Sequence, residues 1–377
     1  MGAADLGEEH PCITGLAAQV KGFHAEEYLK SQKTYLDPAS AFALAGASLA
    51  LQDSGIDLAR EERTRVGVML GSAYGSLSTM NLFFEDFLRK GPRFVKPFLF
   101  PHVYANTAIS LLAIEYTMKG FHTMFSSGFI SAASALLYGG DVIRQGRADV
   151  IVAGGVDALN ATLLRGYAAM GLLAAPSGDG AGSRPFDQRR SGMVLGEGGA
   201  VLILEDWDHA ASRGARVYAE LAGGGMFSGG GVTREEPLYR DALARSMAAA
   251  LSEAETAASA VDYISASANS SRLLDAEEGA AIESLFASTN PGVCVSSIKS
   301  MIGETMGAGG AMQAIGAVGA LMTGQVPATA NLTQPERDWG VRMVMGTAAQ
   351  RQVRNVLVNS VDPGGSVVSL ALRRTGN

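Results

Sequence analysis

Short apolar runs alternate along the chain with longer amphipathic or alanine-rich segments. Asp37 and the proline after it form an N-cap and a first helical turn, and the alanine-rich run that follows stops before Gly55. This pattern predicts a helix over residues 38–53. The apolar run at 66–70 ends in a Gly-Ser pair, which predicts a buried strand that enters a tight turn, with a helix over 77–89 after it.

The same alternation continues to the end of the chain. Strand-like runs are expected at 122–126, 149–153, 200–205, 263–267, 293–297, 355–361 and 367–372. Helices are expected between them, one ending near residue 145 and another starting near residue 275. The repetition predicts a layered α/β architecture in two similar halves that divide near residues 206–215.

Two glycine-rich stretches need separate interpretations. The apolar stretch from Gly307 to Gly324 has about the length of a membrane span, but it consists largely of Gly and Ala and is interrupted by Gln313. We expect a buried, closely packed helix rather than a membrane segment. The glycine runs at 223–225 and 229–231 lack the Lys-Ser/Thr of a phosphate loop, so a mobile surface loop is expected there.

Composition narrows the class of protein. The 377 residues are 47% hydrophobic and 18% charged, which indicates an extensive core, and the net charge of −7 argues against a nucleic-acid or anionic membrane-surface partner. Cys12 and Cys294 are too few for a disulfide framework and too isolated from the five histidines for a zinc site. The acidic start lacks the features of a signal peptide, so a cytoplasmic location is expected.

Several motifs occur in an order typical of one family. Residues 147–205 carry RADVIVAGGVDALN and, further on, RPFDQRRSGMVLGEGGAVLILE. Other matching stretches are VGVMLGSAYG from Val66, PFLFPHVYANTA from Pro97, VSSIKSMIGETMGAGG from Val295 and VNSVDPGG from Val358. With these motifs, the chain resembles the β-ketoacyl-acyl carrier protein synthase family from about Gly15 to Arg373.

The resemblance implies a fold and an assembly. It implies a thiolase-like αβαβα five-layered sandwich of two related halves, here residues 1–210 and 211–377. Such proteins normally dimerise through a strand near the nucleophile, and the resemblance implies no cofactor and no metal. Relatives usually have a further strand and helix before the segment that begins here at Gln19. The first core strand is therefore expected to be missing or replaced.

The family's catalytic residues do not match. Active members attack an acyl thioester with a cysteine at a strand-to-helix turn, where the helix N-terminus favours the thiolate. That position corresponds to Phe129, and the two histidines that assist decarboxylation and stabilise the enolate correspond to Ser267 and Glu304. A phenyl ring forms no thioester, and an ionised Glu304 would oppose a developing oxyanion. The resemblance therefore implies a member without catalytic residues.

Other positions around the site match the family. Lys299 and Glu278 correspond to its buried ion pair, expected to hold the fold, and Asp275 to a nearby carboxylate. Pro363 stands where relatives carry a phenylalanine that gates the acyl pocket. The positions that match the acyl tunnel or the dimer contact are Phe98, Phe100, Tyr104, Asn106 and Thr107. Core packing explains these aromatic residues almost as well.

The sequence gives weaker support for other catalytic groups. Ser126, Ser127 and Ser131 lie near the expected turn, but none has the Gly-x-Ser-x-Gly setting of an esterase. His102 and His122 are expected to be structural or exposed. The charged segment that contains Asp187, Arg189, Arg190 and Glu197 is expected to be a structural loop with solvated or paired charges.

The leading hypothesis is a chain-length-factor-like subunit without condensing activity of its own. Such a subunit pairs with an active ketosynthase and shapes the tunnel for a growing polyketide or fatty-acyl chain, and an acyl carrier protein reaches it through that partner. Relatives of this kind often carry glutamine where Phe129 stands, so the polyketide class stays open. The alternatives are a homodimeric acyl or carrier-protein scaffold, or an acyltransferase or decarboxylase with altered chemistry through Glu304 or a serine.

Overall fold

The computed structural model describes residues 1–3, 15–229 and 239–376, so Cys12 lies outside the described residues. One large sheet has the strand order β4-β3-β5-β7. Its strands are β3 (Val66–Gly71), β4 (His122–Phe125), β5 (Val150–Asp157) and β7 (Gly198–Glu205). The first three run parallel and β7 runs antiparallel to β5. Within the described residues, no strand pairs with the outer edge of β7.

A second large sheet has the order β12-β10-β9-β14-β15-β8. Its strands are β8 (Glu220–Ser228), β9 (Tyr263–Ser265), β10 (Cys294–Ser296), β12 (Arg342–Met343), β14 (Asn355–Val361) and β15 (Ser366–Arg373). The strands expected from sequence at 263–267, 293–297, 355–361 and 367–372 all lie in this sheet.

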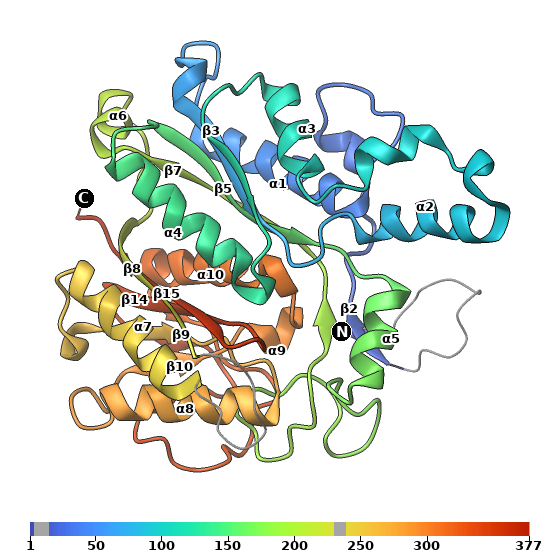
Figure 1. The fold of residues 1–377 in the computed structure, drawn as a ribbon. Helices are drawn as coiled ribbons and strands as arrows, with labels where there is room; N and C mark the ends of the chain where they lie inside the picture. Colours follow the sequence, from blue (N-terminus) through green and yellow to red (C-terminus); the bar gives the residue numbers. More distant parts are fainter. Residues whose placement is uncertain (4–14, 230–238, 377) are drawn as a thin grey trace.

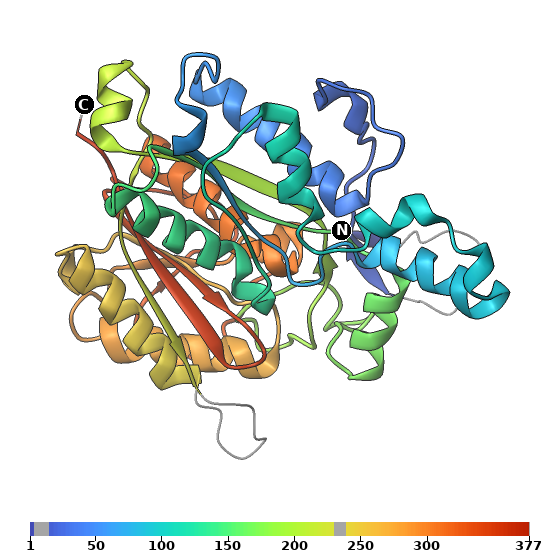
Figure 2. The same cartoon turned by 45° about the horizontal axis from the view of Figure 1, so that its top comes forward.

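Helices separate and cover the two sheets (Figures 1 and 2). The middle layer holds α4 (Ser131–Arg144) and α10 (Gly309–Thr323). The outer layers hold α1 (Pro38–Ser54) and α3 (Thr107–Tyr116) on the first sheet, and α7 (Tyr239–Glu253) and α8 (Arg272–Phe286) on the second. The order α, β, α, β, α confirms the thiolase-like five-layered sandwich. The division into halves at residue 210 stays a prediction.

Shorter elements complete the fold. The remaining helices are α2 (Leu77–Lys90), α5 (Ala161–Ala169), α6 (Trp207–Ser212) and α9 (Lys299–Ile302). The remaining strands are β1 (Gly2–Ala3), β2 (Leu16–Ala18), β6 (Leu195–Gly196), β11 (Gln325–Val326) and β13 (Ala349–Gln350). Strands β1, β2 and β6 form a small sheet of their own.

Helix α1 begins and ends where the sequence predicts. The Asp37 side chain accepts a hydrogen bond from Ala39 N at 2.9 Å, and Gly55 closes the helix in the left-handed conformation. The apolar stretch from Gly307 to Gly324 forms α10 and the turn before it, in the middle layer. No helix in the described part of the chain is long and apolar enough to cross a membrane.

The interpretation of residues 223–225 as a mobile loop is wrong. Gly223, Gly224 and Gly225 lie inside β8, an edge strand that α7 covers. A Cβ at Gly225 would lie 2.3 Å from Ser246 O of α7, and one at Gly223 2.6 Å from Ala250 O. Glycine is therefore needed for the close approach of strand and helix. The second glycine run falls largely outside the described residues.

Candidate functional site

Phe129 lies in a single turn, η5 (Gly128–Ile130), between the end of β4 and the start of α4. Its side chain is 3% exposed and stacks on the ring of Tyr167, with 6.3 Å between the ring centroids. Met193, Leu195 and Met306 belong to the same buried cluster. The space at the turn is therefore filled by an aromatic side chain of the chain itself.

A carboxylate contacts the backbone of this turn. Phe129 N donates to Asp362 Oδ1 at 2.8 Å, and Gly364 N donates to Asp362 Oδ2 at 2.7 Å. Asp362 follows β14 in the glycine-rich segment that the sequence analysis singled out for Pro363 alone. The Tyr239 hydroxyl donates to Pro363 O, which attaches this segment to the start of α7.

Ser267 lies just beyond the end of β9 and links three neighbouring elements. Its backbone N–H donates to Glu278 Oε1 at 2.9 Å. Its hydroxyl oxygen lies 3.0 Å from Val361 N and 3.2 Å from Lys299 Nζ, and both nitrogens donate to it. Because Asp362 follows Val361 directly, one segment of the chain contacts Ser267 through the Val361 backbone and Phe129 through the Asp362 side chain.

Glu304 forms a buried ion pair. Its carboxylate oxygen Oε2 lies 2.8 Å from Lys299 Nζ and 2.8 Å from Asn269 Nδ2, and Met306 N donates to Oε1 at 3.0 Å. Glu304 is 1% exposed and Lys299 is also buried. The structure thus brings Ser267 and Glu304 together around one lysine, within a network that satisfies the buried charge.

The expected ion pair between Lys299 and Glu278 is wrong, because Lys299 pairs with Glu304 instead. Helix α9 ends at Ile302, and the φ of +75° at the next residue, Gly303, turns the chain so that the Glu304 side chain returns to Lys299. Glu278 Oε1 accepts from Ser267 N and from Asn359 Nδ2, whereas Oε2 is buried and has no hydrogen-bond partner among the described residues.

Burial raises the pKa of several carboxyl groups, among them two that lie near Ser267. Removal from water raises the pKa of Glu278 to about 7 and that of Asp275 to about 6. Asp275 accepts from three backbone nitrogens, those of Phe186, Asn269 and Ser270. It therefore holds the segment that contains Phe186 against the segment before α8.

Asp157, at the end of β5, joins the first sheet to the middle layer beside the site. It accepts hydrogen bonds from the Ser72 hydroxyl, Ala73 N and Tyr74 N, and from Gly307 N at 2.6 Å on the segment that leads into α10. No sequence motif singles out Asp157, although its place directly after a buried strand is a usable signal.

The aromatic positions assigned to a tunnel or dimer contact lie on one exposed segment. Phe98 and Phe100 are in the turn η4 (Pro97–His102), and Tyr104 follows it. Their exposed fractions are 53%, 50% and 50%, so core packing does not explain them. Asn106 is also exposed, whereas Thr107 is buried and donates to Pro101 O at 2.8 Å.

Two family models cover most of the chain. The N-terminal domain of β-ketoacyl synthases matches residues 3–210 and the C-terminal domain matches residues 218–333. The chain belongs to the β-ketoacyl synthase family. It is 33% identical to a 3-oxoacyl-[acyl-carrier-protein] synthase 2 from Vibrio cholerae over 96% of this chain and 88% of that protein. It is 34% identical to a putative polyketide β-ketoacyl synthase 1 from Streptomyces halstedii over 89% and 81%.

Solved structures of ketosynthases share the fold of this family member. The ishigamide ketosynthase/chain length factor has a TM-score of 0.90 at 27% identity, over 99% of this chain and 91% of the other. A complex of a type II polyketide synthase acyl carrier protein with its ketosynthase has a TM-score of 0.87 at 26% identity, over 100% and 92%.

Other candidate groups of this synthase-family chain have structural partners. The Ser131 hydroxyl accepts from Ser127 N at 2.9 Å and donates to Gly128 O at 2.6 Å, which holds the turn around Phe129. His122 Nδ1 lies 2.6 Å from Gly120 O. In the charged segment, Arg189 pairs with Asp187 and Arg190 with Glu336, and Glu197 accepts from Val20 N and Leu159 N. The interpretation of paired structural charges is confirmed.

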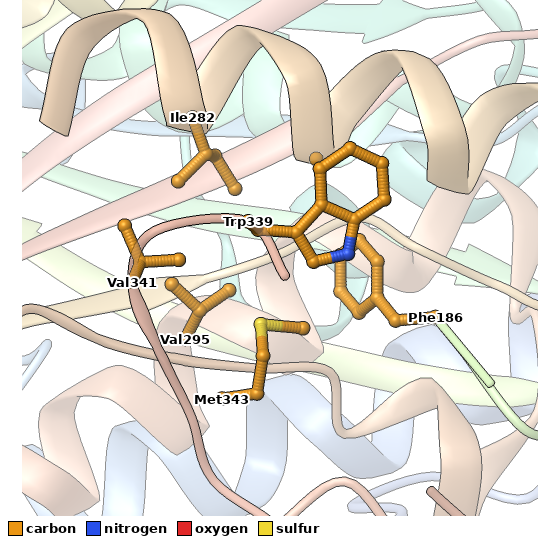
Figure 3. A pocket seen from close by; sticks show the side chains of 7 residues that line it. Phe186, Ile282, Val295, Trp339, Val341 and Met343 are labelled. Carbon is orange, nitrogen blue, oxygen red and sulfur yellow. The ribbon is translucent and has the colours of Figure 1, made fainter. Parts of the chain in front are cut away.

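A small apolar gap lies between α8 and strands β10 and β12, and Phe129 does not line it (Figure 3). It is lined by Phe186, Gly279, Ile282, Val295, Trp339, Val341 and Met343. It has no room for a water molecule, and Trp339 Nε1 beside it is buried with no hydrogen-bond partner in the described part of the chain. Among the described residues, no three His, Cys, Asp or Glu side chains gather in a way that could hold a metal ion.

Proposed function

We propose that this chain is a non-condensing, chain-length-factor-like subunit that pairs with an active ketosynthase and shapes its acyl or polyketide tunnel. One observation carries the proposal. The three positions that match the family's catalytic cysteine and histidines hold Phe129, Ser267 and Glu304, each with packing or hydrogen-bond partners of its own.

The chemistry at these positions supports a chain without condensing activity. Phe129 has no nucleophilic atom, so no acyl group can be held there as a thioester. The Glu304 side chain has no N–H to donate to an enolate oxygen. Its Oε2 accepts from Lys299 and Asn269, and its Oε1 accepts from Met306 N. A side chain that only accepts hydrogen bonds does not stabilise negative charge on a substrate.

Two surface features support a protein partner. Strand β4 is an edge strand of the first sheet and ends four residues before Phe129, in keeping with the strand through which relatives dimerise. Phe98, Phe100 and Tyr104 expose about half of their surface each, and exposed clusters of large apolar side chains mark interaction surfaces. We assign these residues, with Asn106, to the contact with the ketosynthase and to its tunnel, and the buried Thr107 supports their segment through its hydrogen bond to Pro101 O.

The partner supplies what this chain lacks. In this proposal the ketosynthase brings the cysteine and the histidines, and an acyl carrier protein delivers the acyl chain to that subunit. The similarity to a ketosynthase/chain length factor structure at a TM-score of 0.90 supports this assignment. A cytoplasmic location stays a prediction.

Condensation assays test the proposal. The purified chain, given acetyl and malonyl thioesters of acyl carrier protein, is expected to release neither carbon dioxide nor a condensed product. The complex isolated from the native cell is expected to condense, and replacing Phe98 and Phe100 in it changes the length of the product. Turnover by the chain alone that Glu304→Ala or Ser131→Ala abolishes would support altered chemistry instead.

A further inference from the structure

We infer that Asp362 is an internal anion that occupies the acyl-oxygen position of this site, so that the chain rejects an acyl thioester even when a nucleophile is supplied. The inference rests on the non-condensing part of the proposed function and not on the partner. It concerns a property that this chain has by itself.

Acyl transfer to a nucleophile at residue 129 would place negative charge next to the backbone of that residue. The nucleophile would form a C–S bond, the bond to the leaving thiol would break, and the leaving thiolate would take up the proton that the nucleophile lost. Between these steps the former carbonyl oxygen carries negative charge, which backbone N–H groups within about 3 Å stabilise. Phe129 N is the donor at the nucleophile position itself.

In the structure this donor is already in use. Phe129 N lies 2.8 Å from Asp362 Oδ1, within the range of a charge-assisted hydrogen bond. The carboxylate therefore takes the place that an acyl oxygen needs. Its negative charge also opposes both a thiolate and an oxyanion at this turn.

The segment that carries Asp362 holds the carboxylate in this place. Asp362 Oδ2 accepts from Gly364 N at 2.7 Å. The backbone of Asp362 closes a turn, because its N–H donates to Ser366 O and its oxygen accepts from Gly365 N, both at 2.9 Å. The hydrogen bond from Tyr239 to Pro363 O attaches this turn to α7.

The opposite side of the contact is shaped to admit the carboxylate. Gly128 has a φ of +65°, and a Cβ at this residue would lie 1.9 Å from Asp362 Oδ1. Any larger residue would collide with the carboxylate and would strain the turn. Gly128 and Asp362 are 234 positions apart in the sequence, and the missing side chain of the first leaves the space that the carboxylate of the second occupies.

The experiment supplies the missing thiol and measures two reactions. Two variants are compared, Phe129→Cys and Phe129→Cys/Asp362→Ala. Each is purified in the assembly in which the chain occurs, and intact mass spectrometry distinguishes this chain from any other chain in the assembly. Acylation by an acetyl thioester of N-acetylcysteamine needs a stabilised oxyanion, whereas alkylation by iodoacetamide does not. The ratio of the two rates is expected to rise about 100-fold on removal of Asp362, the effect of freeing one oxyanion donor.

The ratio of acylation rate to alkylation rate distinguishes two effects of Asp362, which are occupation of the Phe129 N–H and repulsion of a thiolate at residue 129. A purely electrostatic effect on thiol ionisation raises both rates together and leaves the ratio unchanged, which would overturn the inference. Asp362→Asn is the matched control, because its amide oxygen can still accept from Phe129 N. The ratio for Phe129→Cys/Asp362→Asn is expected to stay within a few-fold of the ratio for Phe129→Cys.

A second variant guards against misfolding, which circular dichroism would reveal. If Asp362→Ala does not fold, Asp362→Ser replaces it, since a serine hydroxyl can still cap Gly364 N but is one atom shorter. The expected rise in the ratio is the same. A partner that is never found leaves this result intact, so the inference and the proposed partnership fail separately.

Discussion

At the scale of single residues, substitution has given the family's site a new set of contacts. Glu304 binds Lys299, which would otherwise be a buried ammonium group beside Ser267. The sequence alone shows that residue 304 is a glutamate in place of the family's histidine. It does not predict the pairing, because that depends on the turn at Gly303, which brings Glu304 back across five residues.

The stability of the Lys299–Glu304 pair can be measured by urea denaturation. Glu304→Ala is expected to lower the free energy of unfolding by about 3–5 kcal/mol, because it leaves a buried lysine without a counter-charge. As a control, Glu85→Ala breaks an exposed pair with Arg89 and is expected to cost less than about 1 kcal/mol. Equal losses in the two variants would contradict the ion pair.

Glu278 makes stability depend on pH. Burial raises its pKa to about 7 in the folded chain, above its ordinary value of 4.5, so the folded state binds the proton more tightly than the unfolded state. Its contribution to stability is fully present below about pH 4.5 and is lost as the pH rises through about 7. Glu278→Gln is expected to reduce the fall in unfolding free energy between these values by up to about 1.4 kcal/mol per pH unit. An unchanged pH profile would contradict this prediction.

At the scale of elements, the sequence predicts what local signals determine. Helix α1 follows from its cap at Asp37 and from Gly55, and most strands of both sheets follow from their apolar runs. Strand β8 was missed because its glycines indicate a loop locally. Only the packing of α7 against β8 explains why glycine is required there.

The exposed aromatic segment around η4 is the element that the proposed partnership needs most. Phe98→Ser/Phe100→Ser is expected to weaken binding of the ketosynthase at least tenfold, because these side chains are typical of interface anchors, while the thermal midpoint of the isolated chain changes little. Affinity is measured by biolayer interferometry with the purified partner.

Trp207→Ser is the matched control, since Trp207 is an aromatic residue that is 57% exposed on α6. In Figure 1, α6 lies across the molecule from α2, the helix that contacts η4. It is expected to leave the affinity unchanged. If both variants bind equally well, η4 is not part of the interface.

At the scale of the whole molecule, the fold places the site where segments from both large sheets meet. The turn before α4 carries Phe129, the turn before α10 carries Met306, and Asp157 connects β5 to Gly307. The family resemblance predicts this five-layered architecture and which residues stand at the site. The contacts of Asp362 and Asp157 could not be predicted, because they join segments more than 80 residues apart.

The partnership is the central claim and can be tested directly. The tagged chain is purified from its native cell and the intact complex is weighed by native mass spectrometry. The account predicts a one-to-one complex with a ketosynthase that carries the active-site cysteine. A complex that contains only copies of this chain would contradict it and would favour a homodimeric scaffold.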